Sequence, residues 1–394
     1  MQAHRLGEVC RSFLKLGFIS FGGPVAHIGY LRGEFVGKRR WLDDAAYGDL
    51  VALCQFLPGP ASTQIVFALG HLRAGWPGGL LASLSFTLPS AVLMILFGYG
   101  VTGIGNLQSA GWLHGLKLAA VAVVAQAVWS MGCRLCPDRT RLTIAIAAAA
   151  TLLLVSGVVV QVGVILAGAL IGWAIYRQSM PVTPAATPAV WKHHLLAGAC
   201  LATYFLLLLL LPMLATATGS KDLAVFDGFY RAGSLVFGGG HVILPLLRAE
   251  VVPKGWVADD VFLAGYGAAQ ALPGPLFTFA GYLGTTMNPG PSAWHDGLWC
   301  LLAIFLPSWL LIAGALPFWH QVRAKHGVQA ALSGANAAVV GVLLAALYNP
   351  VWTEGVKSAP DAALAVAAFG LLQWWNVPPW LVVVLVATAG GGTV

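Results

Sequence analysis

Charged residues are scarce in this chain: Asp, Glu, Lys and Arg together make up 9% of its 394 residues, whereas apolar residues make up 58%. A soluble globular protein carries about a quarter charged residues, so the composition excludes an ordinary soluble domain. The basic residues give a net charge of +7, but they lie singly at the ends of apolar segments. This spacing argues against a nucleic-acid partner and is typical of charges that orient membrane helices.

Cysteines and catalytic motifs are also few. Of the six cysteines, only Cys133 and Cys136 form a CxxC pair, and no second pair completes a tetrahedral metal site. No GxSxG, HExxH or paired Asp motif lies within an apolar span. We therefore predict no disulfide framework, no metal, no cofactor and no enzyme activity. Four charged residues interrupt the first fifteen positions, so we expect no cleavable signal peptide.

Apolar segments follow one another along nearly the whole chain, and several approach the roughly 20 residues that a bilayer requires. The first half contains six such units, at 9–36, 42–74, 77–101, 110–132, 141–156 and 158–177. A linker at 180–188 leads to an additional leucine-rich run, 194–213. The second half repeats six units, at 222–250, 257–288, 293–318, 327–348, 359–374 and 376–391. The sequence therefore predicts an all-α integral membrane protein with about thirteen membrane segments, including broken or re-entrant helices.

Three motifs occur twice and in the same order. Phe-Gly-Gly-Pro at 21–24 returns as Phe-Gly-Gly-Gly at 237–240, and Gln-Phe-Leu-Pro-Gly-Pro at 55–60 returns as Gln-Ala-Leu-Pro-Gly-Pro at 270–275. Leu-Pro-Ser at 88–90 returns at 306–308. Duplicated halves with Gly and Pro interruptions at matching places indicate a transporter with a site between its repeats. The expected domains are a first repeat at 1–178, a linker with an extra helix at 179–215, and a second repeat at 216–394.

The unmatched run at 194–213 decides the predicted orientation of the halves. Six crossings return the chain to its starting side, and one more crossing inverts the second half. Loop charges agree, since the basic residues around 134–141, 177–192 and 323–325 fall on one side in this count, whereas the 102–110 loop has no Lys or Arg. Arg248 and Lys254 are exceptions. We expect a cytoplasmic N-terminus and inverted repeats.

Each Leu-Pro-Gly-Pro motif predicts a helix that stops and restarts. Pro lacks a backbone N–H and Gly permits unusual dihedrals, while the second Pro suits the first position of a new helix. The new helix then presents unpaired N–H groups and the positive end of its dipole, which we expect at Ala61, Ser62, Thr63, Leu276, Phe277 and Thr278. Two such ends at one midplane cavity form an anion site. Simple proline kinks are the alternative interpretation.

Side chains at equal spacing around the breaks favour a site over kinks, because each motif has a Gln before it and a Thr after it. His27 and His241 follow the glycine motifs at unmatched positions, either as structural hydrogen-bonders or as groups that handle protons or ligand. The predicted substrate-binding residues are Gly22, Gly23, Pro24, His27, Arg32, Gln55, Pro58, Gly59, Pro60, Ala61, Ser62, Thr63, Gly238, Gly239, Gly240, His241, Arg248, Gln270, Pro273, Gly274, Pro275 and Thr278. The candidates for coupling are His27, His241, Glu34, Glu250 and Lys117.

Further polar residues have competing interpretations. Arg32 and Arg248 occupy matched positions, and each either supplies countercharge to an anion or anchors a helix end at the interface. Asp44 and Asp259 are typical of helix caps. Lys117 lies about a third of the way into an apolar span, where it either acts in transport or snorkels to the membrane surface.

The motifs quoted above resemble those of the chromate ion transporter (CHR) family, in its two-domain, long-chain form. The resemblance covers nearly the whole chain. It implies a multi-pass protein of the bacterial inner membrane that exports chromate from the cytoplasm and confers chromate resistance. The residue pattern by itself reaches an inverted-repeat transporter of a small anion, and the name of the anion comes from the resemblance.

The sequence leaves alternative substrates and an alternative function open. Sulfate has the shape and charge of chromate, so sulfate or another oxyanion is an alternative cargo or exchange partner. A membrane-embedded anion sensor without transport is the alternative from another class. The expected partners are the small oxyanion and the lipid bilayer, with a homodimer as one possible assembly.

Overall fold

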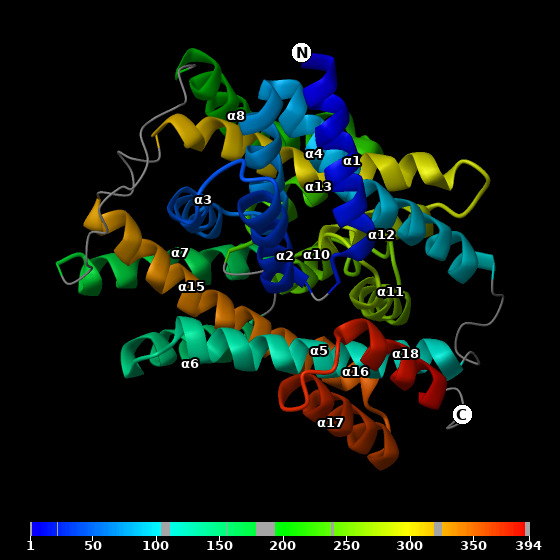
Figure 1. Cartoon of the computed structure of the whole chain (residues 1–394). Helices are drawn as coiled ribbons and strands as arrows, with labels where there is room; N and C mark the ends of the chain where they lie inside the picture. The colour runs from blue at the N-terminus through cyan, green and yellow to red at the C-terminus, as the bar shows by residue number, and fades with distance from the viewer. Residues whose placement is uncertain are drawn as a thin grey trace.

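The computed structural model of the chain describes residues 2–21, 23–103, 111–155, 157–178, 194–237, 240–318 and 325–390. Every regular element within these ranges is a helix (Figure 1). Six stretches are long and apolar enough to cross a bilayer: Ala61–Gly103, His114–Leu135, Val159–Tyr176, His194–Thr218, Ala293–Phe318 and His326–Gly355. The expected all-α membrane fold is therefore confirmed, and the remaining expected units are shorter or broken helices.

The elements of the two halves follow one another in the same order. The first half contains α1 (Gln2–Ile19), α2 (Gly23–Arg32), η1 (Gly33–Lys38), α3 (Asp44–Phe56), α4 (Ala61–Gly103), α5 (Gly111–Leu135), α6 (Arg139–Leu154) and α7 (Val158–Tyr176). After α8 (His194–Thr218), the second half contains α9 (Lys221–Ser234), η3 (Gly240–Val242), α10 (Ile243–Val251), α11 (Asp259–Ala271), η4 (Leu276–Thr278), α12 (Phe279–Met287), α13 (Ala293–Ala315), η5 (Leu316–Phe318), α15 (His326–Ala346), η6 (Leu347–Trp352), α16 (Thr353–Gly355), α17 (Ala359–Gln373) and α18 (Pro379–Gly390).

Helix α4 joins two of the expected units through a sharp bend. Ala74 and Gly75 leave the helical region, and Gly75 has a φ of +68°. The two arms then pack closely, since a Cβ on Gly70 would overlap the backbone carbonyl oxygen of Gly78. The predicted boundary between 42–74 and 77–101 is thus confirmed. The unit at 42–74 is itself two helices, α3 and the first arm of α4.

The last helices of each half pack against the other half. Helix α15 contacts α6 and α7, whereas α5 contacts α17 and α18 (Figure 1). The contact between α15 and α7 is close, because a Cβ on Gly334 would overlap the carbonyl oxygen of Gly168. Small residues at such a crossing let two membrane helices approach to backbone contact. The two halves are therefore intertwined rather than laid side by side.

The unmatched leucine-rich run forms the continuous helix α8, which is long and apolar enough to span a membrane. It packs against α9 and α13. The sequence prediction of one additional membrane-length helix between the halves is confirmed.

Candidate functional site

Both Leu-Pro-Gly-Pro motifs interrupt helices, as the sequence predicts. Helix α3 ends at Phe56 and α4 begins at Ala61, and Gly59 between them has a φ of +113°. In the second half α11 ends at Ala271, and Gly274 has a φ of +97° before the chain turns into η4. These φ values are accessible to glycine and strained for other residues, so both breaks depend on their glycine. We call residues 57–60 the first break and residues 272–275 the second break.

Each break is hydrogen-bonded to the opposite half of the chain. The Gly59 N–H donates to the carbonyl oxygen of Val236 at 2.7 Å, and the Gly274 N–H donates to that of Ser20 at 2.9 Å. Ser20 and Val236 directly precede the two phenylalanines that open the glycine motifs. Four motifs that are far apart in the sequence therefore meet in two matched, crosswise contacts.

The Leu-Pro-Ser motifs cross over in the same way. A Cβ on Gly59 would lie 3.5 Å from the Ser308 Cβ and 3.6 Å from its hydroxyl oxygen. A Cβ on Gly274 would lie 2.6 Å from the Ser90 hydroxyl oxygen. These serines are not among the site residues predicted from the sequence, although the repetition of Leu-Pro-Ser in both halves is a signal that points to them.

Polar groups at the first break are buried and incompletely bonded. The Thr63 side chain is fully buried, and its hydroxyl has no hydrogen-bond partner in the described part of the chain. Gln64, which the sequence analysis missed, is also fully buried and donates through Nε2 to the Pro58 carbonyl oxygen at 2.7 Å. The first backbone bond of α4 runs from the Gln64 N–H to the Pro60 carbonyl oxygen. The N–H groups of the preceding first turn are those that helix geometry leaves free.

The second break differs, and one expectation fails there. Thr278 donates through both its backbone N–H, at 3.0 Å, and its hydroxyl, at 2.9 Å, to the Pro275 carbonyl oxygen. The prediction that the Thr278 N–H is free is therefore wrong. The physical reason is that the chain restarts as the 3₁₀ turn η4, which closes a bond over three residues instead of four.

The two histidines have different partners, as their unmatched positions predict. The His27 ring is buried and its Nε2 lies 3.0 Å from the Ser20 carbonyl oxygen, which also accepts from Gly274. The His241 Nδ1 lies 2.9 Å from the hydroxyl of Tyr266 on α11. His27 therefore helps to hold the carbonyl to which the second break is fastened.

The matched arginines are paired with carboxylates of the protein. Arg32 Nε lies 2.7 Å from Asp44 Oδ1, and Arg248 contacts both Asp259 oxygens at 2.7 and 2.8 Å. The interpretation of Asp44 and Asp259 as helix caps is wrong, because α3 is capped by Asp43, which accepts from the Ala46 N–H, and α11 has no side-chain cap. The carboxylates of Asp44 and Asp259 therefore already neutralise the arginine charges that would otherwise attract an anion.

The two arginine–aspartate pairs differ in exposure. The Arg32 and Asp44 side chains are 61% and 63% exposed, whereas those of Arg248 and Asp259 are 26% and 27% exposed. The matched elements thus have different surroundings in the two halves. Consistent with this difference, α11 packs against α5 and α18, while the contacts of its counterpart α3 are with α2 and α4.

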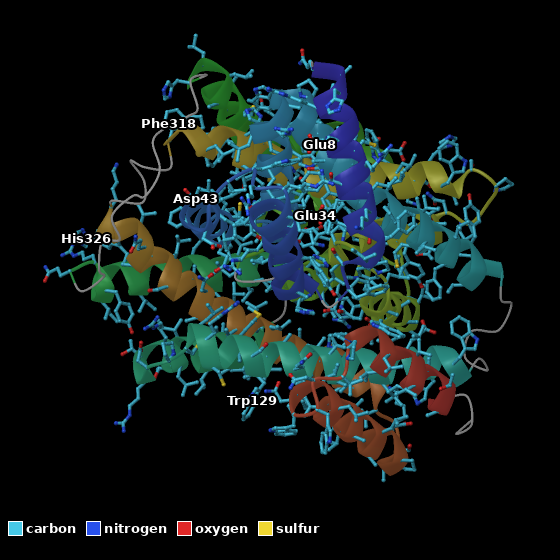
Figure 2. All side chains as sticks on the ribbon, viewed as in Figure 1. Glu8, Glu34, Asp43, Trp129, Phe318 and His326 are labelled. Atoms are coloured by element: carbon cyan, nitrogen blue, oxygen red, sulfur yellow. The ribbon has the colours of Figure 1, made fainter. Side chains whose placement is uncertain are left out.

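The candidate coupling carboxylates are also paired. Glu34 accepts from Arg39 Nε at 2.7 Å, and Arg39 also contacts Glu8 at 3.0 Å; Figure 2 labels Glu8 and Glu34 on neighbouring segments. Glu250 accepts from Lys254 at 2.9 Å. Both candidate carboxylates therefore already have a basic partner among the described residues.

The remaining predicted residues lie at or away from the breaks as follows. Gln55 is exposed near the end of α3, whereas Gln270 is partly buried and its amide nitrogen has no partner in the described ranges. Lys117 is partly buried on α5, which packs against α16. Gly23, with a φ of +73°, and Pro24 begin α2, and Gly240 begins η3. Gly22, Gly238 and Gly239 lie outside the described residues.

Comparison with known proteins identifies the family. The sequence profile of the family described as Chromate transporter matches residues 7–173 and, a second time, residues 223–391. The chain belongs to the chromate transporter family. The "Chromate transport protein" of Pseudomonas aeruginosa is 30% identical over 96% of this chain and 90% of its own length. The "Probable chromate transport protein" of Synechococcus elongatus is 29% identical over 98% of this chain and 95% of its own length. No solved structure matches the chain.

Membership in the chromate transporter family confirms the resemblance drawn from the motifs. Together with the six membrane-length helices, it makes this chain a multi-pass integral membrane protein. A transporter family also agrees with the expectation that the chain is not an enzyme. Within the described residues, no group of three or more His, Cys, Asp or Glu side chains is placed to hold a metal ion.

Proposed function

We propose that this protein exports chromate across the bacterial inner membrane and thereby confers chromate resistance. The crosswise bonds of Gly59 and Gly274 carry the proposal, because they bring two broken helices from opposite halves into one structural unit. Broken backbone at membrane depth is tolerated only where it is buried in protein or lines a water-filled cavity. The names of the relatives from Pseudomonas aeruginosa and Synechococcus elongatus indicate chromate as the cargo.

In this proposal the anion binds at the midplane between the breaks, at the N-termini of helices from both repeats. Burying a dianion is costly unless its oxygens are hydrogen-bonded, and each charge-assisted bond contributes roughly 1.5–3 kcal/mol. Free first-turn N–H groups of α4 and the Thr63 hydroxyl supply donors at the first break. The arginines take a structural part, since both are engaged by aspartates.

The Thr63 hydroxyl gives the first testable prediction. Thr63→Val is expected to raise the apparent KM for chromate about tenfold, because it removes a buried donor worth about 1–2 kcal/mol while keeping the shape of the side chain. Thr278→Val is expected to raise KM less, because that hydroxyl already donates to Pro275. Initial rates of transport over a range of chromate concentrations measure both constants. Thr143→Val, on the exposed face of α6, is the control, and equal KM values for Thr63→Val and the control would contradict the prediction.

The proposed architecture is an inverted repeat of thirteen membrane segments, with repeats at 1–178 and 216–394 joined by a linker and α8. Matched contacts support it: the breaks bond crosswise, and α5 and α15 each pack against the last two helices of the other half. Helix α8 supplies the odd crossing that inverts the second repeat. The N-terminus is then cytoplasmic and the C-terminus lies outside.

Cysteine labelling tests the inversion. Cys133 at the end of α5 is exposed, and an impermeant thiol reagent is expected to label it in everted vesicles and not in intact cells. In a Cys133→Ser background, Ser109→Cys and Val394→Cys, both outside the described residues, are expected to react from the outside. Arg177→Cys provides the cytoplasmic control. Reaction of Ser109→Cys from the cytoplasm alone contradicts the inverted arrangement.

Export of an anion requires no proton coupling in this proposal. Moving one charge down 100 mV contributes about 2.3 kcal/mol, so an inside-negative potential favours the exit of a dianion by about twice that amount. His27, His241, Glu34, Glu250 and Lys117 are then structural or ligand residues. A transport rate that depends on the potential and is insensitive to an imposed pH gradient is the expected result.

Uptake of labelled chromate into everted vesicles tests the function itself. Vesicles that contain the protein are expected to accumulate chromate faster than vesicles without it, and a potassium diffusion potential that is positive inside is expected to increase the rate. Excess sulfate separates the alternatives, because a general oxyanion transporter or exchanger is inhibited by sulfate and carries labelled sulfate itself. Anion-dependent thermal stabilisation without flux would favour a sensor and overturn the proposal.

A further inference from the structure

Ser308 is the polar side chain that the second half places against the first break. It follows Pro307 within α13, and its side chain is fully buried. Its hydroxyl oxygen lies 3.6 Å from the position of a Cβ on Gly59. Gln64 flanks Gly59 as well, with its Nε2 at 3.0 Å from the same position. The first break is therefore enclosed by side chains from both halves.

The bonding of Ser308 departs from what a serine in a membrane helix normally does. Such a hydroxyl usually donates to a carbonyl oxygen three or four residues earlier in its own helix. The matched Ser90 follows this rule and donates to the Thr87 carbonyl oxygen at 3.1 Å. The Ser308 hydroxyl has no partner in the described part of the chain. An unpaired buried hydroxyl is costly, which indicates that a ligand atom completes its bonding.

Thr63 provides a second observation of the same kind. Its hydroxyl is also fully buried and unpaired in the described ranges, and it lies four residues after Gly59 at the start of α4. The first turn after the first break and the α13 segment packed against that break thus each carry an unpaired buried hydroxyl. The corresponding hydroxyls at the second break, those of Ser90 and Thr278, are both bonded to carbonyl oxygens of their own segments.

We propose that Ser308 is a substrate-contacting residue, and that its hydroxyl donates to an oxygen of a tetrahedral oxyanion bound at the first break. This inference rests on the proposed function. A site built in this way requires residues of both halves, since α4 supplies Thr63 and the free backbone N–H groups while α13 supplies Ser308. The two breaks are then unequal: Ser308 and Thr63 at the first have unpaired hydroxyls in the described part of the chain, whereas Ser90 and Thr278 at the second are bonded to carbonyl oxygens.

The experiment compares Ser308→Val with Ser308→Thr, because these two side chains have nearly the same shape and differ in the hydroxyl. In everted vesicles, Ser308→Val is expected to raise the KM for chromate about tenfold with little change in maximal rate, whereas Ser308→Thr stays within about twofold of the Ser308 protein. Ser333→Ala is the control, since that hydroxyl donates to the Ala330 carbonyl oxygen on α15. Ser90→Ala is expected to raise KM less than Ser308→Val.

Equal KM values for the Val and Thr variants overturn the inference, and so does an effect of Ser90→Ala as large as that of Ser308→Val. If the valine variant inserts poorly into the membrane, a second measurement still tests the inference. Sulfate or chromate is expected to raise the Tm of the protein in detergent, and this rise is expected to shrink in Ser308→Ala and to persist in Ser308→Thr. Absence of chromate uptake by the unmodified protein defeats the proposed function. Normal uptake with unchanged Ser308 variants defeats only the role of Ser308.

Discussion

Gly274→Ala is expected to reduce the rate of chromate transport at least tenfold. Gly274 has a φ of +97°, and an added Cβ would lie 2.6 Å from the Ser90 hydroxyl oxygen and 3.2 Å from its Cβ. Non-glycine residues pay roughly 1–2 kcal/mol in left-handed conformations, and the contact with Ser90 adds to this cost. To relieve this strain and overlap, the second break has to move, and the movement pulls the Gly274 N–H away from the Ser20 carbonyl oxygen. Initial rates, normalised to the amount of inserted protein, measure the loss.

Two comparisons show whether geometry causes that loss. Gly59→Ala carries the same backbone strain at a φ of +113°, but the nearest atom to its Cβ is the flexible end of Gln64 at 3.0 Å, so its effect is expected to be smaller. Gly100→Ala, on α4 where a Cβ meets nothing within 4 Å, is expected to leave transport unchanged. A fully active Gly274→Ala protein would show that the second break tolerates displacement and takes no part in the site.

The largest loss of stability is expected for Arg231→Met. Arg231 Nη2 lies 2.6 Å from Asp227 Oδ2 and 3.5 Å from Glu250 Oε1. The two carboxylate side chains are 6% and 4% exposed, and Lys254 also contacts Glu250. Removing one partner of a buried pair typically costs about 3–5 kcal/mol, because the remaining charge is left uncompensated. Thermal unfolding in detergent is expected to show a Tm lowered by several degrees.

The control for this variant is Arg5→Met, which removes an exposed arginine of α1 and is expected to change Tm little. A double variant, Arg231→Met with Asp227→Leu, removes one of the stranded carboxylates and is expected to recover part of the Tm. If Arg231→Met unfolds at the temperature of the unmodified protein, the cluster around Glu250 is not an ion-pair network that stabilises the fold. Its carboxylates would then be available for coupling, as the sequence pattern first suggested.

The sequence by itself determined the features that depend on local chemistry. A low content of charged residues and long apolar runs predict a helical membrane protein, because the bilayer offers no hydrogen-bond partner for unpaired backbone groups. A glycine with a positive φ between two prolines that lack an N–H ends a helix, so the breaks before Ala61 and Leu276 follow from the Leu-Pro-Gly-Pro motifs. The repeated motifs also identified the family.

Only the tertiary structure decided which groups meet. The spacing of residues in the sequence does not predict that the Gly59 N–H donates to the Val236 carbonyl oxygen or that Arg32 pairs with Asp44. Nor does it predict that Ser308 faces the first break. These contacts depend on how α13 and the glycine motifs approach the breaks in space. The sequence pattern also treats the two halves as equal, whereas the Thr63 hydroxyl has no partner among the described residues and the Thr278 hydroxyl donates to the Pro275 carbonyl oxygen. The difference arises because the chain restarts as an α-helix after the first break and as a 3₁₀ turn after the second, and a 3₁₀ turn closes its bond over three residues instead of four.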